Sequence, residues 1–284
     1  MSLTTPNDLL LTAQSAGYAV PAFNANCLEM IAPLISAAEK EQAPLIIQIS
    51  RRFLMHATTE SIAAVTHAIA KKTQVPITLH LDHGTGEEQA KCCLKAGFTS
   101  IMYDGSSLPF TDNVEKTRQV VNVCSMFRIP TEGEVGIVPI MKGEDYKKPE
   151  NELTSVEEAV EFVRETGVFS LAVAVGNVHG MRTKEARVDF KRIEEIRKAV
   201  KVPLVIHGSS GISDADLQRA IACGICKVNI ATEFSGVFVK SLYAQYREKP
   251  GELYPMEIIS PAQTAVEELA RDRIRVLGAS GRYV

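Results

Sequence analysis

Eight short apolar segments, each followed by a stretch with helical periodicity, constrain the fold of this chain most strongly. The segments are continuously apolar, which indicates strands buried on both faces, as in a parallel sheet. They cover residues 19–24, 44–50, 75–82, 100–104, 130–135, 170–176, 203–208 and 225–230. Eight strand–helix units in roughly 250 residues predict a (β/α)8 barrel. A doubly wound sheet is the alternative, but no glycine-rich fingerprint follows the first segment.

Helices are predicted between these strands and at both ends of the chain. Those between the strands cover 28–41, 59–72, 87–96, 112–127, 155–166, 190–200 and 213–223. A first helix ends at Ala16, and two closing helices cover Glu233–Glu248 and Pro261–Arg273. No linker rich in Gly, Pro or Ser divides the chain. Residues 1–284 are therefore interpreted as one barrel domain with an amino-terminal helix and a carboxy-terminal helical extension.

The composition excludes several classes of function. The chain has 284 residues, of which 45% are hydrophobic, and a formal net charge of -3. Without a basic patch there is no electrostatic case for a nucleic-acid partner. No apolar stretch approaches the ~20 residues that a bilayer span requires, so no membrane is expected. No signal peptide is recognised, and the six scattered cysteines are usual in a reducing compartment, so we expect a cytoplasmic protein.

Three histidines follow predicted strands at their carboxyl ends, where barrel enzymes carry their active sites. They are His83, His179 and His207, each close to a glycine. Imidazoles from three strands can form an open Zn²⁺ site that leaves coordination positions for a substrate. A single histidine of this kind would more commonly be a hydrogen-bonded structural residue. The shared position of all three favours a metal.

Carboxylates accompany these histidines. Asp82 adjoins His83 and could either bind a metal or move protons for a substrate held by the metal. Glu132 and Glu134 share one face of the fifth strand. Carboxylates in a buried strand are costly unless they are paired, so these two are predicted to orient the imidazoles.

Two loops have the composition of an anion site. Gly208–Gly211 follows the seventh strand, and Asn229–Thr232 follows the eighth and opens a helix. Small residues expose backbone N–H groups, and many barrels bind phosphate with these two loops. Ordinary turn and capping chemistry would explain the same residues. A metal beside a phosphate site predicts a substrate with a carbonyl and a phosphate. The expected reaction breaks or forms a C–C bond through a metal-stabilised enediolate.

Seven stretches of the chain form an ordered set of motifs: Tyr18–Asn24, His80–Gly84, Tyr103–Phe110, Glu132–Gly136, Ala174–Gly180, His207–Gly211 and Lys227–Thr232. In order and spacing they resemble the class II, zinc-dependent ketose-bisphosphate aldolases of the fructose- and tagatose-bisphosphate type. The resemblance implies an enzyme of carbohydrate metabolism, as in glycolysis. Its phosphorylated sugar substrate would be cleaved to dihydroxyacetone phosphate and an aldehyde. It also implies a homodimer or homotetramer.

The resemblance assigns roles to individual residues. Zinc would be held by His83, His179 and His207, and Asp82 would act as acid and base on the C4 hydroxyl. Three further carboxylates would either support the metal ligands from behind or form an alternate metal position: Asp104, Glu132 and Glu134. The substrate and its C1 phosphate would be bound by Asn24, Ser50, Gly180, Gly208, Ser210, Asn229 and Thr232. Lys184 would lie near that phosphate or near an accompanying monovalent cation (Na⁺ or K⁺), and Glu144 and Asp145 would belong to a loop that supplies a further acid.

The departures from the family pattern concern the substrate. Ala231 replaces the Asp that fructose-bisphosphate enzymes often carry and looks more like the tagatose-bisphosphate branch. Ser235 lies where many relatives place a cation for the distal phosphate. Arg51 and Arg52 follow Ser50, where the family usually has small residues. We hypothesise that the distal anion site has moved to Arg51 or Arg52; the alternative is that both are surface charges.

Other functions remain possible on the same barrel. A Schiff-base aldolase needs a lysine at a strand's carboxyl end, but Lys227 lies near the start of the eighth strand. A metal-dependent hydrolase barrel needs a His-x-His pair on the first strand, which is absent. An aldolase for a different ketose 1-phosphate, with an altered distal group, is a closer alternative. The last alternative is a noncatalytic helper subunit that keeps the fold. The presence of all three histidines together with Asp82 argues against it.

Overall fold

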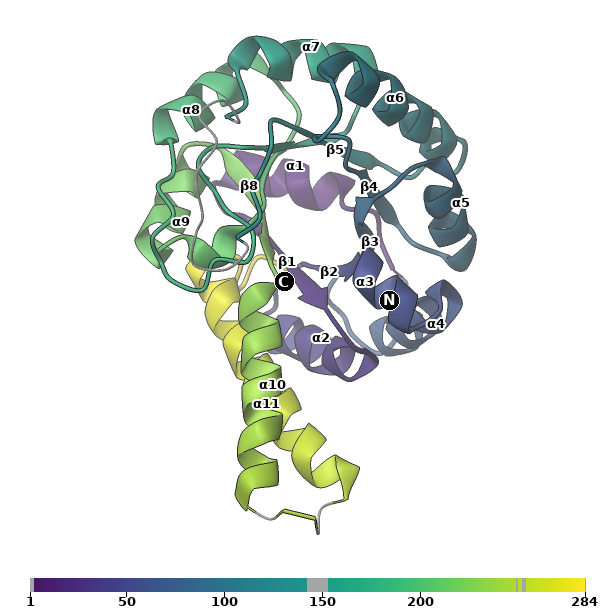
Figure 1. The fold of residues 1–284 in the computed structure, drawn as a ribbon, viewed down its shortest axis with the longest axis vertical. Helices are drawn as coiled ribbons and strands as arrows, with labels where there is room; N and C mark the ends of the chain where they lie inside the picture. The colour runs from purple at the N-terminus through teal and green to yellow at the C-terminus, as the bar shows by residue number, and fades with distance from the viewer. Residues whose placement is uncertain (1–2, 142–152, 249, 252–253, 284) are drawn as a thin grey trace.

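The computed structural model describes residues 3–141, 153–248, 250–251 and 254–283. Its centre is a closed barrel in which eight parallel strands follow one another in chain order (Figure 1). The strands are β1 Val20–Ala25, β2 Leu45–Ser50, β3 Ile77–Gly84, β4 Ser100–Tyr103, β5 Thr131–Val135, β6 Ser170–Val173, β7 Leu204–Ile206 and β8 Ile225–Ile230. Closure between β1 and β8 confirms the predicted (β/α)8 barrel and excludes the doubly wound sheet.

Helices surround the barrel as predicted, and most begin and end at recognisable signals (Figure 1). In α7, for example, Ser155 and Glu158 form a reciprocal capping box, and Gly167 ends the helix in a left-handed conformation. The α-helices are α1 Asn7–Ala16, α2 Ile31–Lys40, α3 Arg51–His56, α4 Thr59–Ala70, α5 Glu87–Ala96, α6 Phe110–Met126, α7 Val156–Thr166, α8 Phe190–Ala199, α9 Asp214–Ala222, α10 Thr232–Glu248 and α11 Pro255–Val276. Two 3₁₀ turns, η1 Leu28–Met30 and η2 Ser209–Gly211, complete the described elements.

The structure contains one helix that the sequence did not predict, and among the predicted boundaries it differs most clearly at α11 and β6. The short helix α3 was missed; Ser50 caps it by accepting a hydrogen bond from the Phe53 N–H. Helix α11 begins at Pro255, so Pro261 lies inside the helix rather than at its start. Strand β6 ends at Val173 rather than at Gly176.

Inside the barrel, buried polar residues occupy the layer below the carboxyl ends of the strands. The ammonium of Lys227 lies 2.7 Å from a carboxylate oxygen of Glu132, and both side chains are almost fully buried. His80 is bonded to the Ser100 hydroxyl at 2.7 Å. Buried charges are tolerated only when they are paired, so this layer holds Glu132 firmly in place beneath the site.

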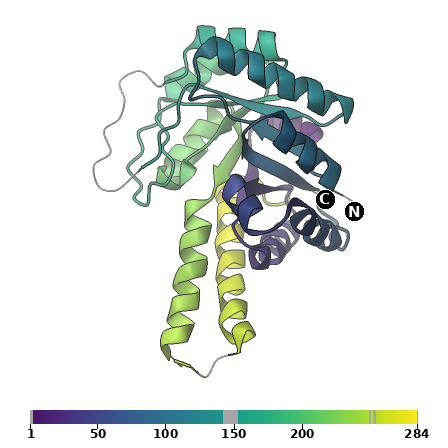
Figure 2. The same cartoon turned by 45° about the vertical axis from the view of Figure 1, so that its right-hand side comes forward.

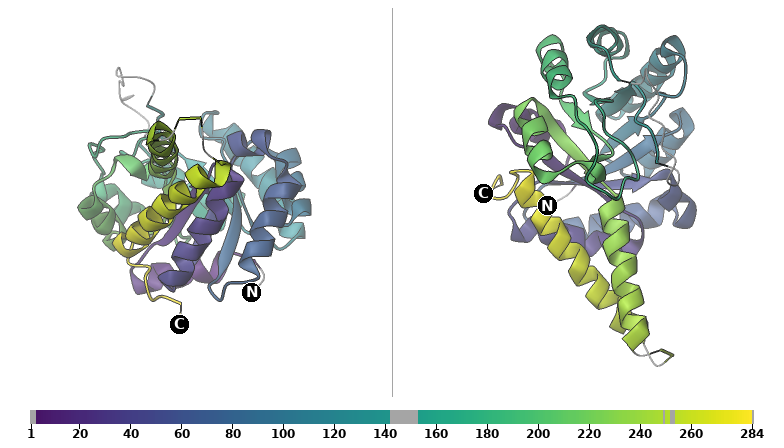
Figure 3. Two further views of the ribbon diagram at one scale, coloured as in Figure 1. Left: turned by 90° about the horizontal axis from the view of Figure 1, so that it is seen from below. Right: turned by 60° about the vertical axis from the view of Figure 1, so that its left-hand side comes forward.

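Helices α10 and α11 form a hairpin that extends away from the barrel (Figures 2 and 3). The base of α11 packs against α2. Exposed apolar side chains on the hairpin include Val239, Tyr243 and Tyr246. Among the described residues, no helix has both the length and the hydropathy to cross a membrane.

Glu41 fastens α11 to the end of α2 and should contribute measurably to stability. Its buried carboxylate accepts hydrogen bonds from Arg271, Arg275 and Ser280. Because both arginines are partly exposed, we expect Glu41→Gln to lower the free energy of unfolding by about 1–2 kcal/mol. This corresponds to a melting temperature lower by roughly 3–6 °C. Glu39→Gln, at an exposed position of the same helix, is the control.

The effect of Glu41 should depend on pH in a defined direction. Burial alone would raise the pKa of Glu41, but the hydrogen bonds from Arg275 and Arg271 lower it below the ordinary value of 4.5. Its contribution is therefore complete above that value and is lost as the pH falls through the folded-state pKa. The difference in melting temperature between wild type and Glu41→Gln should shrink in acid. A difference that grows in acid would contradict this role.

Candidate active site

Three histidines converge at the carboxyl ends of the strands. His83 lies in β3, while His179 and His207 follow β6 and β7. One ring nitrogen from each lies within 4.8 Å of the others. The ring planes are close to perpendicular, with centroids 4.8–5.9 Å apart. The structure thus brings together the three residues that the sequence pattern proposed as metal ligands.

His83 has a strained backbone conformation, and its imidazole is oriented by a side-chain hydrogen bond. Its φ of 51° lies in the left-handed region, which costs roughly 1–2 kcal/mol for a residue with a Cβ. Nδ1 lies 2.7 Å from a carboxylate oxygen of Asp104. The other oxygen of Asp104 accepts bonds from the backbone and hydroxyl of Ser106. With Nδ1–H donating to Asp104, Nε2 of His83 is the nitrogen free to bind a metal.

His207 is oriented in the same manner from below. Its Nε2 lies 2.9 Å from a carboxylate oxygen of Glu132, whose other oxygen faces Lys227. The side-chain nitrogen of Asn229 lies 3.0 Å from the same Nε2. In the tautomer whose Nε2–H donates to Glu132, Nδ1 is the nitrogen available to a metal. Asn177 fixes the backbone by donating to the His207 carbonyl at 3.0 Å.

The donor set fits a divalent metal. Nδ1 of His207 and Nε2 of His83 lie 3.0 Å apart, and the other nitrogen of each ring contacts a carboxylate. Two lone pairs facing each other at this distance require a cation or a proton between them. Three neutral imidazoles are a common donor set for Zn²⁺ in an open site. Metal chemistry is therefore compatible with the residues present.

A second group of possible ligands lies beside the first. His83, Asp104 and Glu134 also place one donor atom each within 4.8 Å of the others. One carboxylate oxygen of Glu134 is buried without a hydrogen-bond partner among the described residues. Such an orphaned oxygen is expected where a metal can move or where a substrate hydroxyl binds. Of the three residues predicted for an alternate metal position, this group contains Asp104 and Glu134 but not Glu132, and the position stays a prediction.

The electrostatics of the site favour a cation. Burial alone would lower the pKa of His83, but the Asp82 and Asp104 carboxylates raise it to about 10. Burial, together with the neighbouring Asp104, raises the pKa of Glu134 to about 8. Burial and the adjacent imidazoles lower the pKa of His179 to about 3. Carboxylates outnumber the single buried Lys227, so a bound cation would relieve their mutual repulsion.

Asp82 lies beside the histidines and is held as a carboxylate. It is 6% exposed and accepts hydrogen bonds from Asn24 at 2.7 Å and Asn229 at 3.4 Å. Burial alone would raise its pKa, but His83, His207 and the Asn24 bond lower it. One of its oxygens lies 3.8 Å from Nε2 of His83. This position suits a group that exchanges a proton with a substrate bound at the three nitrogens.

A cavity of about 160 Å³ opens above these residues. Its walls include the predicted substrate residues Asn24, Ser50, Gly180, Gly208, Ser210, Asn229 and Thr232. Gly180 and Gly208 have φ values of 75° and 58°, which let their loops pass close to one another. The small residues predicted to form the phosphate site are therefore gathered at one place.

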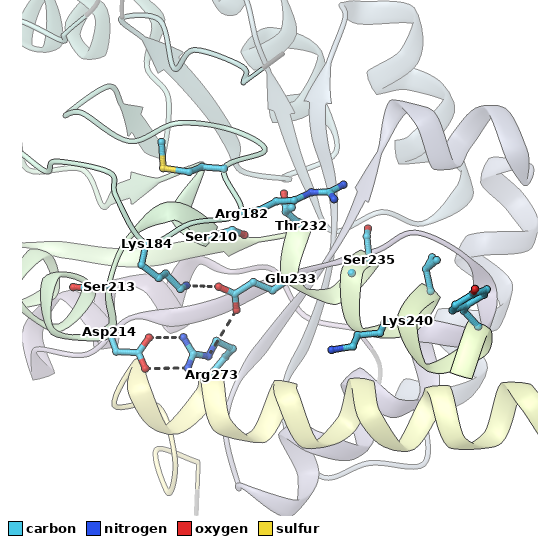
Figure 4. Close-up of a pocket in the computed structure, with 14 residues that line it drawn as sticks. Arg182, Lys184, Ser210, Ser213, Asp214, Thr232, Glu233, Ser235, Lys240 and Arg273 are labelled. Carbon is cyan, nitrogen blue, oxygen red and sulfur yellow. Dashed lines mark hydrogen bonds and ion pairs between the residues drawn. The ribbon is translucent and has the colours of Figure 1, made fainter. Parts of the chain in front are cut away.

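Lys184 lies outside this small cavity. It lines a neighbouring cavity of about 1020 Å³, of which Ser210 and Thr232 form a shared wall (Figure 4). There its ammonium is paired with Glu233 (Figure 4). The predicted role of Lys184 beside the phosphate or a monovalent cation therefore requires that this ion pair be shared or broken.

The two arginines after β2 differ in position. Both lie on α3 and are exposed, but Arg52 lines a third cavity, of about 900 Å³, whereas Arg51 is not among its lining residues. The predicted loop acids Glu144 and Asp145 lie outside the described residues.

Sequence reasoning overlooked two supporting residues. Gln48 is fully buried and its amide lies 3.5 Å from the Asn24 side-chain oxygen. As the one amide in an otherwise apolar strand, it could have been noticed. Asn177 lies within the motif Ala174–Gly180, but its role of anchoring His207 was not predicted, because the carbonyl that it contacts lies 30 residues away in the chain.

Comparison with known proteins decides the family. Residues 4–282 match the class II fructose-bisphosphate aldolase family. The chain belongs to this family. Class II aldolases are metal-dependent carbon–carbon lyases that act on phosphorylated sugars, so this chain is an enzyme of that class.

Solved structures of class II aldolases share the fold over nearly the whole chain. The YdjI aldolase from Escherichia coli K12 is 32% identical with a TM-score of 0.87, covering 99% of this chain and 100% of that one. A putative fructose-1,6-biphosphate aldolase from Coccidioides immitis is also 32% identical, with a TM-score of 0.87, covering 97% and 96%. The fructose-bisphosphate aldolase of Campylobacter jejuni is 21% identical with a TM-score of 0.82, covering 98% and 96%, and shares the fold.

Gly208 should be required for metal affinity in this aldolase. A Cβ at Gly208 would lie 2.6 Å from the Val178 carbonyl carbon and 2.9 Å from the His179 nitrogen. Gly208→Ala should push the two ligand loops apart and weaken Zn²⁺ binding at least about 10-fold, as loss of a supporting contact does. Competition with a chromophoric chelator measures this affinity.

Gly17→Ala is the matched control, because Gly17 has a similar φ of 69° but no described atom within 4 Å of its would-be Cβ. It should cost about 1–2 kcal/mol of stability through backbone strain alone. Equal Zn²⁺ affinities for the two variants would refute the proposed role of Gly208.

Proposed function

We propose that this chain is a zinc-dependent aldolase that cleaves a ketose 1,6-bisphosphate of the tagatose or fructose type. The products would be dihydroxyacetone phosphate and an aldehyde. The observation that carries the proposal is the convergence of Nε2 of His83 and Nδ1 of His207, 3.0 Å apart, beside the buried carboxylate of Asp82. The Coccidioides structure, whose description names fructose-1,6-biphosphate, supports the substrate class.

The protein residues would divide the work as follows. A zinc ion held by His83, His179 and His207 would polarise the ketose carbonyl and stabilise the negative charge that develops on oxygen. Asp82 would accept the C4 hydroxyl proton as the C3–C4 bond breaks and return it in the reverse reaction. Asn24 and Asn229 hold Asp82 in its ionised form for this step.

The substrate would be oriented by its C1 phosphate. The loops of Gly180, Gly208, Ser210 and Thr232 would bind that phosphate through backbone N–H groups and hydroxyls. Asn24, Ser50 and Asn229 would contact the sugar. Lys184 would balance the phosphate charge directly or beside a monovalent cation such as Na⁺ or K⁺.

Asp104, Glu132 and Glu134 would act through the histidines. Asp104 would accept from Nδ1–H of His83 and Glu132 from Nε2–H of His207, which would leave the two facing nitrogens to bind the ion. Glu134 would offer an alternate position to the ion. We also propose a homodimer or homotetramer, which would cover the exposed tyrosines of α10.

Cleavage of an altered ketose 1-phosphate is the second candidate, favoured by the unusual Arg52 at the mouth of the barrel. A Schiff-base mechanism is disfavoured, because the only lysine inside the barrel among the described residues is Lys227, and it is paired with Glu132. The intact histidine and Asp82 geometry disfavours a helper subunit.

The proposal is tested by aldol cleavage of fructose 1,6-bisphosphate and tagatose 1,6-bisphosphate, followed through release of dihydroxyacetone phosphate. Cleavage should stop after treatment with EDTA and return with Zn²⁺. The ratio of the two rates assigns the stereochemistry at C4. Cleavage that survives EDTA and is trapped by borohydride would replace the proposal with a Schiff-base mechanism.

A further inference from the structure

The third cavity, which Arg52 lines, adjoins the candidate active site and shares Gly180 and Thr232 of the phosphate loops with it. Its volume of about 900 Å³ is ample for a small-molecule site. His83, His179 and Gly180 line both this cavity and the small one above Asp82. The far wall is formed by Arg52 from α3, by Ser106 and Ser107 after β4, and by residues 137–140. The two cavities thus run from the phosphate loops, past the histidines, to Arg52.

Arg52 is a cation without an assigned partner in this cavity. The structure gives its guanidinium no ion pair or hydrogen bond among the described residues. In the neighbouring cavity, by contrast, Arg273 is paired with Asp214 (Figure 4). The two acids on the walls beside Arg52 face the histidines instead, since Asp104 is bonded to His83 and Glu134 is buried.

The hydroxyls beside Arg52 differ in availability. The Ser106 hydroxyl donates to Asp104 at 2.7 Å, so its proton is already engaged. Ser107 is exposed at the cavity wall, and its hydroxyl can donate to a ligand. A guanidinium and a hydroxyl donor on the walls of one cavity suit a carboxylate or a phosphate as ligand.

We propose that Arg52 and Ser107 bind an anionic group at the end of the substrate opposite the C1 phosphate. The inference rests on the proposed aldolase function and defines its substrate class as a ketose 1-phosphate whose far end carries a phosphate or a carboxylate. Arg51 is not part of this site. Adjacent residues of a helix point about 100° apart, and only Arg52 lines the cavity.

The test uses the condensation reaction of the zinc-loaded protein with dihydroxyacetone phosphate and three 2-hydroxyaldehydes. Glyceraldehyde ends in a neutral group, glyceraldehyde 3-phosphate in a phosphate, and tartronate semialdehyde in a carboxylate. The readout is the ratio of kcat/KM for each anionic aldehyde to that for glyceraldehyde. The higher of the two ratios identifies the phosphate or the carboxylate as the natural group.

In the wild type we expect one anionic aldehyde to be preferred over glyceraldehyde. Arg52→Ala should lower that preference about 10- to 100-fold, as expected for loss of hydrogen bonds between charged groups. Arg52→Lys should retain part of it, because the charge remains but the planar fork is lost. Arg51→Ala, on the same helix with the same loss of charge, should change the preference less than about 3-fold because an exposed charge is screened by solvent.

Two outcomes would overturn the proposal: a wild type that does not prefer either anionic aldehyde, or equal losses in Arg51→Ala and Arg52→Ala. Failure of the underlying aldolase function is recognised separately. In that case dihydroxyacetone phosphate alone would not exchange a carbon-bound proton with D₂O on the zinc-loaded protein. Exchange without anion preference would refute the Arg52 site and leave the aldolase function standing.

Discussion

Asp82→Asn should lower the rate of C–C bond cleavage by about 10²- to 10⁴-fold, the usual contribution of a positioned acid or base. The reason is that the asparagine amide cannot accept the C4 hydroxyl proton. Zinc should still bind, because Asp82 lies 3.8 Å from the nearest nitrogen of His83 and the three imidazoles are unchanged. Initial rates of dihydroxyacetone phosphate release, with zinc content measured on the same samples, give the result.

A partial reaction separates this role from a structural one. Exchange of a proton between dihydroxyacetone phosphate and D₂O involves no C4 hydroxyl. It should therefore persist in Asp82→Asn within about 10-fold of the wild type, while cleavage falls far more. If exchange and cleavage fell by the same factor, Asp82 would have to be assigned to enolisation or to site structure.

His207→Ala should abolish both metal binding and catalysis. His207 is fully buried, and its removal leaves two imidazoles and exposes Glu132 to an empty space. Loss of an outer partner of a ligand costs 10- to 100-fold in metal affinity, so loss of the ligand itself should exceed about 100-fold. Zinc affinity measured by chelator competition, and proton exchange measured by NMR, should fall together.

His56→Ala is the matched control, because it removes an exposed imidazole on α3. It should leave zinc affinity unchanged. Tight stoichiometric zinc in His207→Ala would show that the ion binds elsewhere, for instance at His83, Asp104 and Glu134.

The sequence predicted the barrel because its strands are apolar at consecutive positions, as expected for strands that are buried on both faces. The residues of β1 and β8, for example, are buried throughout. The predicted start of the last helix was wrong because two prolines in that region could each mark a first helical turn. Proline favours the first turn of a helix, which is consistent with the predicted start at Pro261. In the structure Pro255 occupies the first turn and Pro261 is tolerated inside α11.

The convergence of the three histidines was predictable because each lies at or beyond the carboxyl end of an apolar strand, and these strand ends meet at one face of a barrel. Their protonation was not predictable. It depends on which carboxylate contacts which nitrogen, such as Asp104 with Nδ1 of His83 and Glu132 with Nε2 of His207. Nor could the sequence choose between Arg51 and Arg52, because that choice depends on the helix α3 that was missed.

The central claim is that His83, His179 and His207 hold a metal that activates the ketose phosphate. The most direct measurement is proton exchange on dihydroxyacetone phosphate in D₂O, followed by NMR, with zinc-loaded, EDTA-treated and zinc-restored protein. It is independent of the unknown aldehyde partner. We predict stereospecific loss of one carbon-bound proton signal with zinc, no loss after EDTA, and recovery when zinc is returned. Exchange that is absent from the zinc-loaded protein, or that is unaffected by EDTA, would contradict the claim.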